Sequence, residues 1–319
     1  MGLVEMLRLC GRGMLVSNEV VSLVGAVGLI ALALSWHKRN ASPVRLAQIG
    51  WVCVGLYFFN DAFLYLAHDD LILTLFSIMT LPMALGMAVW EARAEEEKSK
   101  SSLTWARGAV AYAGGPYLLI AHVPWLSVLA IWFVASQAVF FLRFSGGDYI
   151  VMGETWVNTA EGQVAWSEFE GNRWFMGSSA EEYVFQTELL LADGTPIGIN
   201  FVLACTALQS MVIFIGAIAV LDIDWRRRLR VLFLTIPLIH ILNLFRNAGL
   251  IWLHTTYVEW TLLGMSVFEF GHSYVARFVS LFAMFIMALI MFDLLPELHR
   301  HIVRLLKPLG LLQPKNRPN

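Results

Sequence analysis

Long, uninterrupted apolar segments are the feature that most constrains this chain. A run of about 20 apolar residues can cross the hydrocarbon core of a bilayer as a helix. Of the 319 residues, 58% are hydrophobic and 14% are charged, whereas soluble domains carry about 25% charge. The pattern predicts an all-α polytopic protein of the cell membrane, with about eight transmembrane helices. The predicted spans lie near residues 16–36, 46–66, 71–90, 106–121, 125–142, 201–221, 230–253 and 273–293.

Residues 143–200 interrupt the helical pattern. This stretch contains nine acidic and two basic residues. Its segment YIVMGETWVNTAEGQVAWSEF is rich in Val, Trp and Thr, and turn residues break it into short runs. Such short runs bounded by Gly, Asn and Glu predict small β-strands. We therefore expect a small extracytoplasmic β-rich insert that packs onto the membrane helices.

The distribution of Lys and Arg predicts which ends of the helices face the cytoplasm. The segment DIDWRRRLR at 222–230 carries four arginines between two spans. The chain then divides into N-terminal transmembrane helices (1–142), an external insert (143–200), a second set of transmembrane helices (201–295) and a basic cytoplasmic tail (296–319). The basic loops at 37–45 and 91–107 conflict with eight full crossings. Either the 106–121 segment is re-entrant or these loops break the rule.

Polar residues recur near the outer ends of the predicted sixth and seventh spans. If the sixth helix begins at Asn200, a favourable N-cap residue, Cys205 lies about 7–8 Å below that end. Arg246 lies about 12 Å below the same surface by the same helical rise. Asn243 shares the face of Arg246, and Asn247 flanks it. An ionisable residue at this depth usually faces a cavity or a bundle interior.

The last span adds two candidates. His272 is expected at its outer rim, and Arg277 about a turn and a half deeper, at a depth similar to that of Cys205 and Arg246. In a regular α-helix positions 272 and 277 are about 140° apart, so we expect only one of them to face a given substrate carbonyl. Each residue also has a plain structural interpretation, since a buried cysteine packs as a small hydrophobe and an arginine can extend to the interface.

Other residue patterns exclude several functions. Cys10, Cys53 and Cys205 are far apart and form no CxxC pair, so neither a disulfide framework nor a metal centre is expected. His240 and His254 are too far apart on one helix to share a metal. With a net charge of −2 and no basic stripe, no nucleic-acid partner is expected. We expect no cofactor.

Three segments together resemble the exosortase/archaeosortase family of membrane transpeptidases, and most of all its archaeosortase A branch. They are LACTALQSM, LNLFRNAGL and HSYVARFVS, beginning at residues 203, 242 and 272. The resemblance implies that Cys205 is the thioester-forming nucleophile and Arg246 the second catalytic residue, as proton donor or oxyanion stabiliser. The third position matches either His272 or Arg277. Ala276 stands where the histidine pattern has glycine, which favours Arg277.

The resemblance also implies a substrate and a partner. Members of the family cleave exported proteins near a short C-terminal motif, such as Pro-Gly-Phe, that precedes a transmembrane helix and a basic end. In archaea this cleavage is coupled to attachment of a membrane lipid. Two alternatives remain open from the sequence: a transporter or receptor whose intramembrane arginines bind an anionic ligand, and a non-catalytic subunit that holds a partner's tail helix.

Overall fold

The structure is a computed structural model that describes residues 18–37, 44–67, 70–146, 150–159, 161–176, 184–262 and 264–307. Cys10 lies outside the described residues. The helices are α2 (Asn18–His37), α3 (Val44–Ala67), α4 (Leu71–Arg93), α5 (Glu97–His122), α6 (Pro124–Phe144), α7 (Leu208–Ala219), α8 (Trp225–Thr256), α9 (Val267–Phe270), α10 (Ala276–Leu294) and α11 (Pro296–Leu306). A 3₁₀ turn, η2 (Leu203–Thr206), precedes α7, and a π-helical turn, η3 (Gly271–Val275), joins α9 to α10.

Six of the described helical segments are long and apolar enough to span a membrane: Glu19–His37, Val44–Ala67, Leu71–Arg93, Pro124–Phe144, Trp225–Thr256 and Val267–Leu294. This supports a multi-pass membrane protein, but it does not confirm eight crossings. The two remaining predicted spans correspond to α5 and α7. The first turns of α5 are polar, and α7 has only 12 residues, which at 1.5 Å per residue cover about 18 Å.

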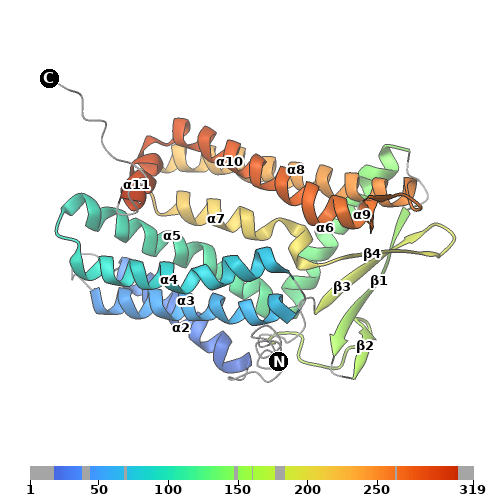
Figure 1. The fold of residues 1–319 in the computed structure, drawn as a ribbon, viewed down its shortest axis with the longest axis horizontal. Helices are drawn as coiled ribbons and strands as arrows, with labels where there is room; N and C mark the ends of the chain where they lie inside the picture. The colour runs from blue at the N-terminus through green and yellow to red at the C-terminus, as the bar shows by residue number, and fades with distance from the viewer. Residues whose placement is uncertain are drawn as a thin grey trace.

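The two helices that fall short of these criteria pack against each other within the bundle (Figure 1). Gly216 of α7 faces the backbone carbonyl of Ala109 on α5 so closely that a Cβ atom at this position would clash with it. The Trp105 indole on α5 donates a hydrogen bond to the carbonyl of Ala217, 3.0 Å away. The short helix α7 is thereby fixed along one side of α5.

The predicted β-rich insert forms a four-stranded antiparallel sheet of order β2-β1-β3-β4. Its strands are β1 (Ile150–Thr159), β2 (Gly162–Ala165), β3 (Phe185–Leu191) and β4 (Pro196–Phe201). Phe185, Thr187 and Leu189 alternate along β3 and are buried, as expected where one face of a sheet is covered. The covering helix is α6, whose buried residues share one hydrophobic core with the sheet. A two-stranded ribbon, β5 (Thr261–Leu262) and β6 (Met265–Ser266), follows α8.

The sheet and α11 lie at opposite ends of the bundle (Figure 1). At its start, α8 contacts α11, since Arg227 forms an ion pair with Glu297. At its other end, the His254 ring hydrogen-bonds the Ile197 carbonyl of the sheet. Near the α11 end, His301 stacks on Trp105 of α5 with ring centroids 5.3 Å apart. Burial, with Arg304 and Arg300 nearby, lowers the pKa of His301 to about 4, so the ring is neutral at physiological pH.

The described parts of the chain next to the two basic loops lie at one end of the bundle. The end of α2 and the α4–α5 turn both lie near the α11 end of α5, because Arg107 contacts Ser35 and Glu91 there. Helix α5 then leads to the sheet end, where His122 contacts Phe175. Helix α6 runs obliquely to the other helices and packs against the sheet (Figure 1). The end of α2 and the α4–α5 turn therefore lie at the same end of the bundle as the start of α8 and its arginines. The sheet lies at the other end.

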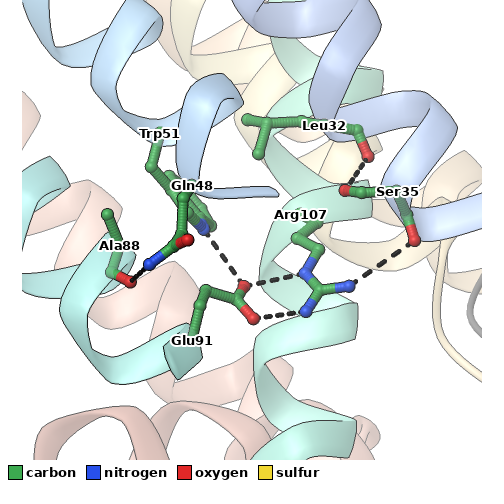
Figure 2. A network of polar contacts seen from close by, with 7 residues as sticks. All are labelled: Leu32, Ser35, Gln48, Trp51, Ala88, Glu91 and Arg107. Carbon is green, nitrogen blue, oxygen red and sulfur yellow. Dashed lines mark hydrogen bonds and ion pairs between the residues drawn. The ribbon is translucent and has the colours of Figure 1, made fainter. Parts of the chain in front are cut away.

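A buried ion pair ties four helices together at the α11 end (Figure 2). Glu91 of α4 is 4% exposed and Arg107 of α5 is 6% exposed. Their side chains meet in a two-point contact that includes Arg107 Nε to Glu91 Oε1 at 2.7 Å. The Trp51 indole of α3 donates to the same carboxylate at 3.1 Å, and Arg107 reaches the Ser35 carbonyl of α2. Each charge is thus compensated and hydrogen-bonded, which burial in apolar surroundings requires.

Removing one member of this pair should destabilise the protein strongly. Glu91→Ala leaves Arg107 charged and buried, a situation that costs about 3–5 kcal/mol. We expect a large fall in the thermal unfolding midpoint of the purified protein in detergent. The double variant Glu91→Leu/Arg107→Leu should recover most of that loss, because no unpaired charge remains.

The control is Glu97→Ala, which removes the exposed ion pair between Glu97 and Lys100 and should cost about 0–1 kcal/mol. A Glu91→Ala midpoint no lower than that of Glu97→Ala would contradict the importance of the buried pair.

Candidate active site

Cys205 lies in the 3₁₀ turn η2, directly after the sheet. Strand β4 includes Asn200 and ends at Phe201, so the prediction that Asn200 caps a membrane helix is wrong. The chain instead turns at η2, where the Cys205 amide donates to the Val202 carbonyl at 2.9 Å. Ala207 then adopts a left-handed conformation with φ 55° and ψ 14° before α7 begins. Cys205 is therefore presented by a tight turn between a strand and a helix.

The backbone at this turn is strained. In the described part of the chain, Ala207 is the one non-glycine residue with positive φ. A residue with a Cβ in the left-handed region costs about 1–2 kcal/mol, and such conformations persist only where the surroundings impose them. Thr206 helps to hold the turn in this conformation, since its buried hydroxyl donates a hydrogen bond to the Leu203 carbonyl at 2.7 Å.

Two side-chain amides of α8 hold the backbone of Cys205 in place. Asn243 and Asn247 are one helical turn apart on the same face, and both are buried. The Nδ2 atom of Asn243 donates to the Cys205 carbonyl oxygen at 2.8 Å, and that of Asn247 donates to the same oxygen at 2.9 Å. These two residues, predicted only as supporting members of the site, therefore determine where the cysteine lies.

Arg246 lies between the two asparagines on α8 and is half-buried. Its guanidinium lies within electrostatic range of the Cys205 sulfur and of Arg277. One of its terminal nitrogens, Nη1, is 3.4 Å from the Asn247 side-chain oxygen. Its Nε atom is buried, and no described residue accepts a hydrogen bond from it. The predicted approach of Cys205 and Arg246 is thus present in the structure, together with an unsatisfied donor.

His272 and Arg277 are not separated as a regular α-helix would separate them. The η3 turn runs from Gly271 to Val275, and the Ala276 amide donates to the Gly271 carbonyl five residues earlier. Hydrogen bonds of this π type bring residues five apart nearly above each other. The π turn thus reduces the angle of about 140° that a regular helix would put between positions 272 and 277. Arg277 lines the cavity described below, whereas His272 is not among its lining residues. Both residues lie within electrostatic range of Arg246.

The two candidates on this helix have different partners. The His272 ring stacks on Phe268, with ring centroids 5.7 Å apart. Arg277 forms a two-point ion pair with Asp70, from Nη2 to Oδ2 at 2.6 Å and from Nη1 to Oδ1 at 3.2 Å. Sequence reasoning missed Asp70. The available signal was an acidic residue at the start of an apolar helix, but its partner is 207 residues away in the chain.

A cavity of about 720 Å³ adjoins these residues. Arg246, Arg277 and Asn243 form a polar part of its wall, and Ala204 and Ala207, on either side of Cys205, also line it. Most of the remaining wall is apolar and comes from α4, α8 and α10, including Ile72, Leu73, Phe76, Ile239, Leu242, Phe278, Met284 and Met287. The thiol side chain itself packs at the edge of the core that α6 shares with the sheet.

His240 and His254, which are too far apart on one helix to share a metal, both have hydrogen-bond partners in the structure. His240 hydrogen-bonds the Gln137 side chain of α6 at 2.8 Å, while His254 contacts the sheet as described above. Within the described ranges, no group of three or more His, Cys, Asp or Glu side chains is arranged to hold a metal ion.

Part of the chain is similar to a known membrane protein. Archaeosortase A of Haloferax volcanii is 42% identical over 62 residues, which are 19% of this chain and 20% of the relative. The matched segment thus spans about a fifth of the relative's length. No protein-family model matches the chain, and no solved structure matches it. The similarity supports kinship with a sortase-like membrane protein over a short segment, and activity, substrates and partners are matters for a proposal.

Because the Cys205 carbonyl accepts two hydrogen bonds, we expect substitutions of the two donors to destabilise the protein non-additively. In Asn243→Leu or Asn247→Leu, the other amide still satisfies the carbonyl, and each loss should cost about 0.5–1.5 kcal/mol. The double variant leaves a buried carbonyl unpaired, which adds about 1–3 kcal/mol. Thermal unfolding of the four proteins, with Asn200→Leu on the exposed strand as control, measures this coupling. Strict additivity of the two single variants would contradict a shared acceptor.

Proposed function

We propose that this chain is a membrane-embedded cysteine peptidase or transpeptidase of the archaeosortase type, with Cys205 as nucleophile. The proposal is supported by the short archaeosortase similarity and by the elements that converge at η2. Helix α8 anchors the backbone of the cysteine through two amides and places a guanidinium within electrostatic range of its sulfur.

The unsatisfied Nε–H group of Arg246 is the observation that carries the proposal. A buried donor without an acceptor costs about 1–3 kcal/mol, and native structures rarely retain one without a reason. Arg246 also lines the cavity. A substrate carbonyl oxygen in this cavity would supply the missing acceptor. Its hydrogen bond would strengthen as negative charge develops on that oxygen during attack.

The reaction follows from these positions. The thiol loses its proton, and the thiolate attacks the scissile carbonyl carbon, forming a C–S bond while the carbonyl electron pair moves to oxygen. The Arg246 guanidinium stabilises that oxyanion. The C–N bond then breaks, and the leaving amine takes up a proton equivalent to the one that the thiol lost. A thioester at Cys205 remains. An amine or water then attacks the thioester carbonyl carbon and releases a proton to solvent, the C–S bond breaks and the thiolate returns.

Arg246 acts in this scheme as a charge and a hydrogen-bond donor. An arginine side chain does not release its proton in proteins, so stabilisation of the oxyanion explains its position better than proton donation does. Arg277 is a weaker source of net charge, because Asp70 compensates it. His272 and Arg277 both remain candidates for the third functional residue.

The form of the cavity suggests the substrate. Arg246, Asn243 and Arg277 provide polar contacts for a short peptide motif. The apolar wall along α8 and α10 would accommodate the start of a transmembrane helix. We therefore propose exported proteins with a C-terminal motif, transmembrane helix and basic end as substrates, and a membrane lipid as the acceptor. The same proposal places the site near the extracytoplasmic face, on the side of the sheet.

A transporter or receptor that binds an anion through intramembrane arginines is the main rival. Two uncompensated guanidinium groups facing the cavity would favour it, but the Asp70–Arg277 ion pair leaves Arg277 compensated.

Variants of the two central residues test the proposal. The substrate is a reporter protein that ends in Pro-Gly-Phe, a transmembrane helix and a basic end, co-expressed with the chain. Cys205→Ser should fold and insert but leave the reporter uncut, since a hydroxyl without a strong adjacent base is a poor nucleophile. Arg246→Lys keeps the positive charge but loses the Nε–H donor, and should lower the cleavage rate about 10²–10³-fold.

The matched control is Arg226→Lys at the exposed start of α8, which should cleave at the wild-type rate. Cleavage by Cys205→Ser or Cys205→Ala near the wild-type rate would refute the proposed nucleophile. Wild-type activity of Arg246→Lys would show that positive charge alone suffices at this position.

A further inference from the structure

We infer that Asp70 is a positioning residue of this site, which holds the Arg277 guanidinium in a fixed orientation at the cavity wall. The inference rests on the proposed function and adds a residue that neither the sequence motifs nor the archaeosortase resemblance assigns. It stands on the ion pair between α10 and the residue that precedes α4.

Asp70 is itself held firmly. Its Oδ1 atom accepts a hydrogen bond from the Leu73 amide at 3.0 Å, so the side chain caps the N-terminus of α4. Its own amide donates to the Tyr65 carbonyl at 3.0 Å. With both its backbone and its carboxylate fixed, Asp70 offers Arg277 two oxygens in a defined plane. Two parallel hydrogen bonds between a guanidinium and a carboxylate add orientation as well as energy.

Burial alone would raise the pKa of the Asp70 carboxyl group. The hydrogen bond and charge of Arg277, together with the amides of Leu73 and Ile72, outweigh this effect and hold the pKa below its usual range. Asp70 is therefore ionised at neutral pH. The side chains of Asp70 and Arg277 are 17% and 32% exposed, so solvent only partly screens the pair.

The orientation of Arg277 determines what it can offer to a substrate. The carboxylate engages one hydrogen on each of Nη1 and Nη2. A guanidinium has five N–H donors, so Nε–H and the outer hydrogens keep their directions fixed by the ion pair. Because Arg277 lines the cavity, these N–H groups belong to the cavity wall.

Asp70 also balances the charge of the site. Arg246 and Arg277 lie within electrostatic range of each other and line the same cavity, where poorly screened like charges repel. The carboxylate compensates Arg277 and leaves Arg246 as the uncompensated positive charge within electrostatic range of Cys205. One such charge matches the single negative charge of a thiolate or an oxyanion.

Three sets of substitutions at this ion pair distinguish orientation of the Arg277 guanidinium from a purely structural contact between the helices. Asp70→Asn keeps the N-cap function, since Asn caps as well as Asp, but removes the charge. We expect kcat on the tail-bearing reporter to fall about tenfold to hundredfold, with little change in KM or in the thermal midpoint. Asp70→Glu should restore part of kcat. The exchanged pair Asp70→Arg/Arg277→Asp should restore the contact between the helices but not kcat, because its guanidinium belongs to α4.

Asp224 provides the matched control, because it caps α8 through the Arg226 and Arg227 amides. Asp224→Asn should leave kcat unchanged. Full activity of Asp70→Asn, or recovery of wild-type kcat by the exchanged pair, would overturn the inference. Cys205→Ala is assayed in parallel to distinguish the two proposals. Cleavage by Cys205→Ala refutes the proposed nucleophile. An inactive Cys205→Ala together with a fully active Asp70→Asn refutes only the role of Asp70.

Discussion

The carbonyl oxygen of Cys205 accepts two hydrogen bonds from α8, and the geometry of the site depends on this contact. Asn243 and Asn247 lie one turn apart, so a straight helix presents both amides to the same oxygen. The intervening Arg246 lies on the same helix and is within electrostatic range of the sulfur. The left-handed Ala207 next to the turn is a backbone conformation that such anchoring can maintain.

Charge compensation in apolar surroundings is the second constraint. At the α11 end, Glu91 and Arg107 are enclosed and fully paired, and they join four helices (Figure 2). Near the sheet end, Asp70 pairs with Arg277, while the Nε atom of Arg246 is buried without an acceptor among the described residues. Among the buried side-chain atoms without a partner in the described residues, which also include Arg228 Nε and Glu297 Oε2, the Arg246 Nε atom belongs to a residue that lines the cavity.

The sequence predicted the features that depend on local pattern. Hydropathy identified most of the long helices, residue composition identified the β-rich insert, and helical spacing placed Asn243 and Arg246 on one face. It failed where tertiary contacts override local pattern. The 3₁₀ turn at Cys205 and the π turn before Arg277 depend on packing and hydrogen bonds that a single sequence does not display. Asp70 was missed because its partner is distant in the chain, and the oblique course of α6 reflects its burial against the sheet.

Detection of a covalent intermediate tests the central claim most directly. The purified protein is incubated with a peptide that carries the motif and the start of a transmembrane helix, quenched in acid and examined by intact-mass and peptide mass spectrometry. The account predicts an acyl group linked to Cys205 as a thioester, which hydroxylamine removes and which Cys205→Ala cannot form. Cleavage of the peptide without any adduct at Cys205, or an adduct on another residue, would contradict it.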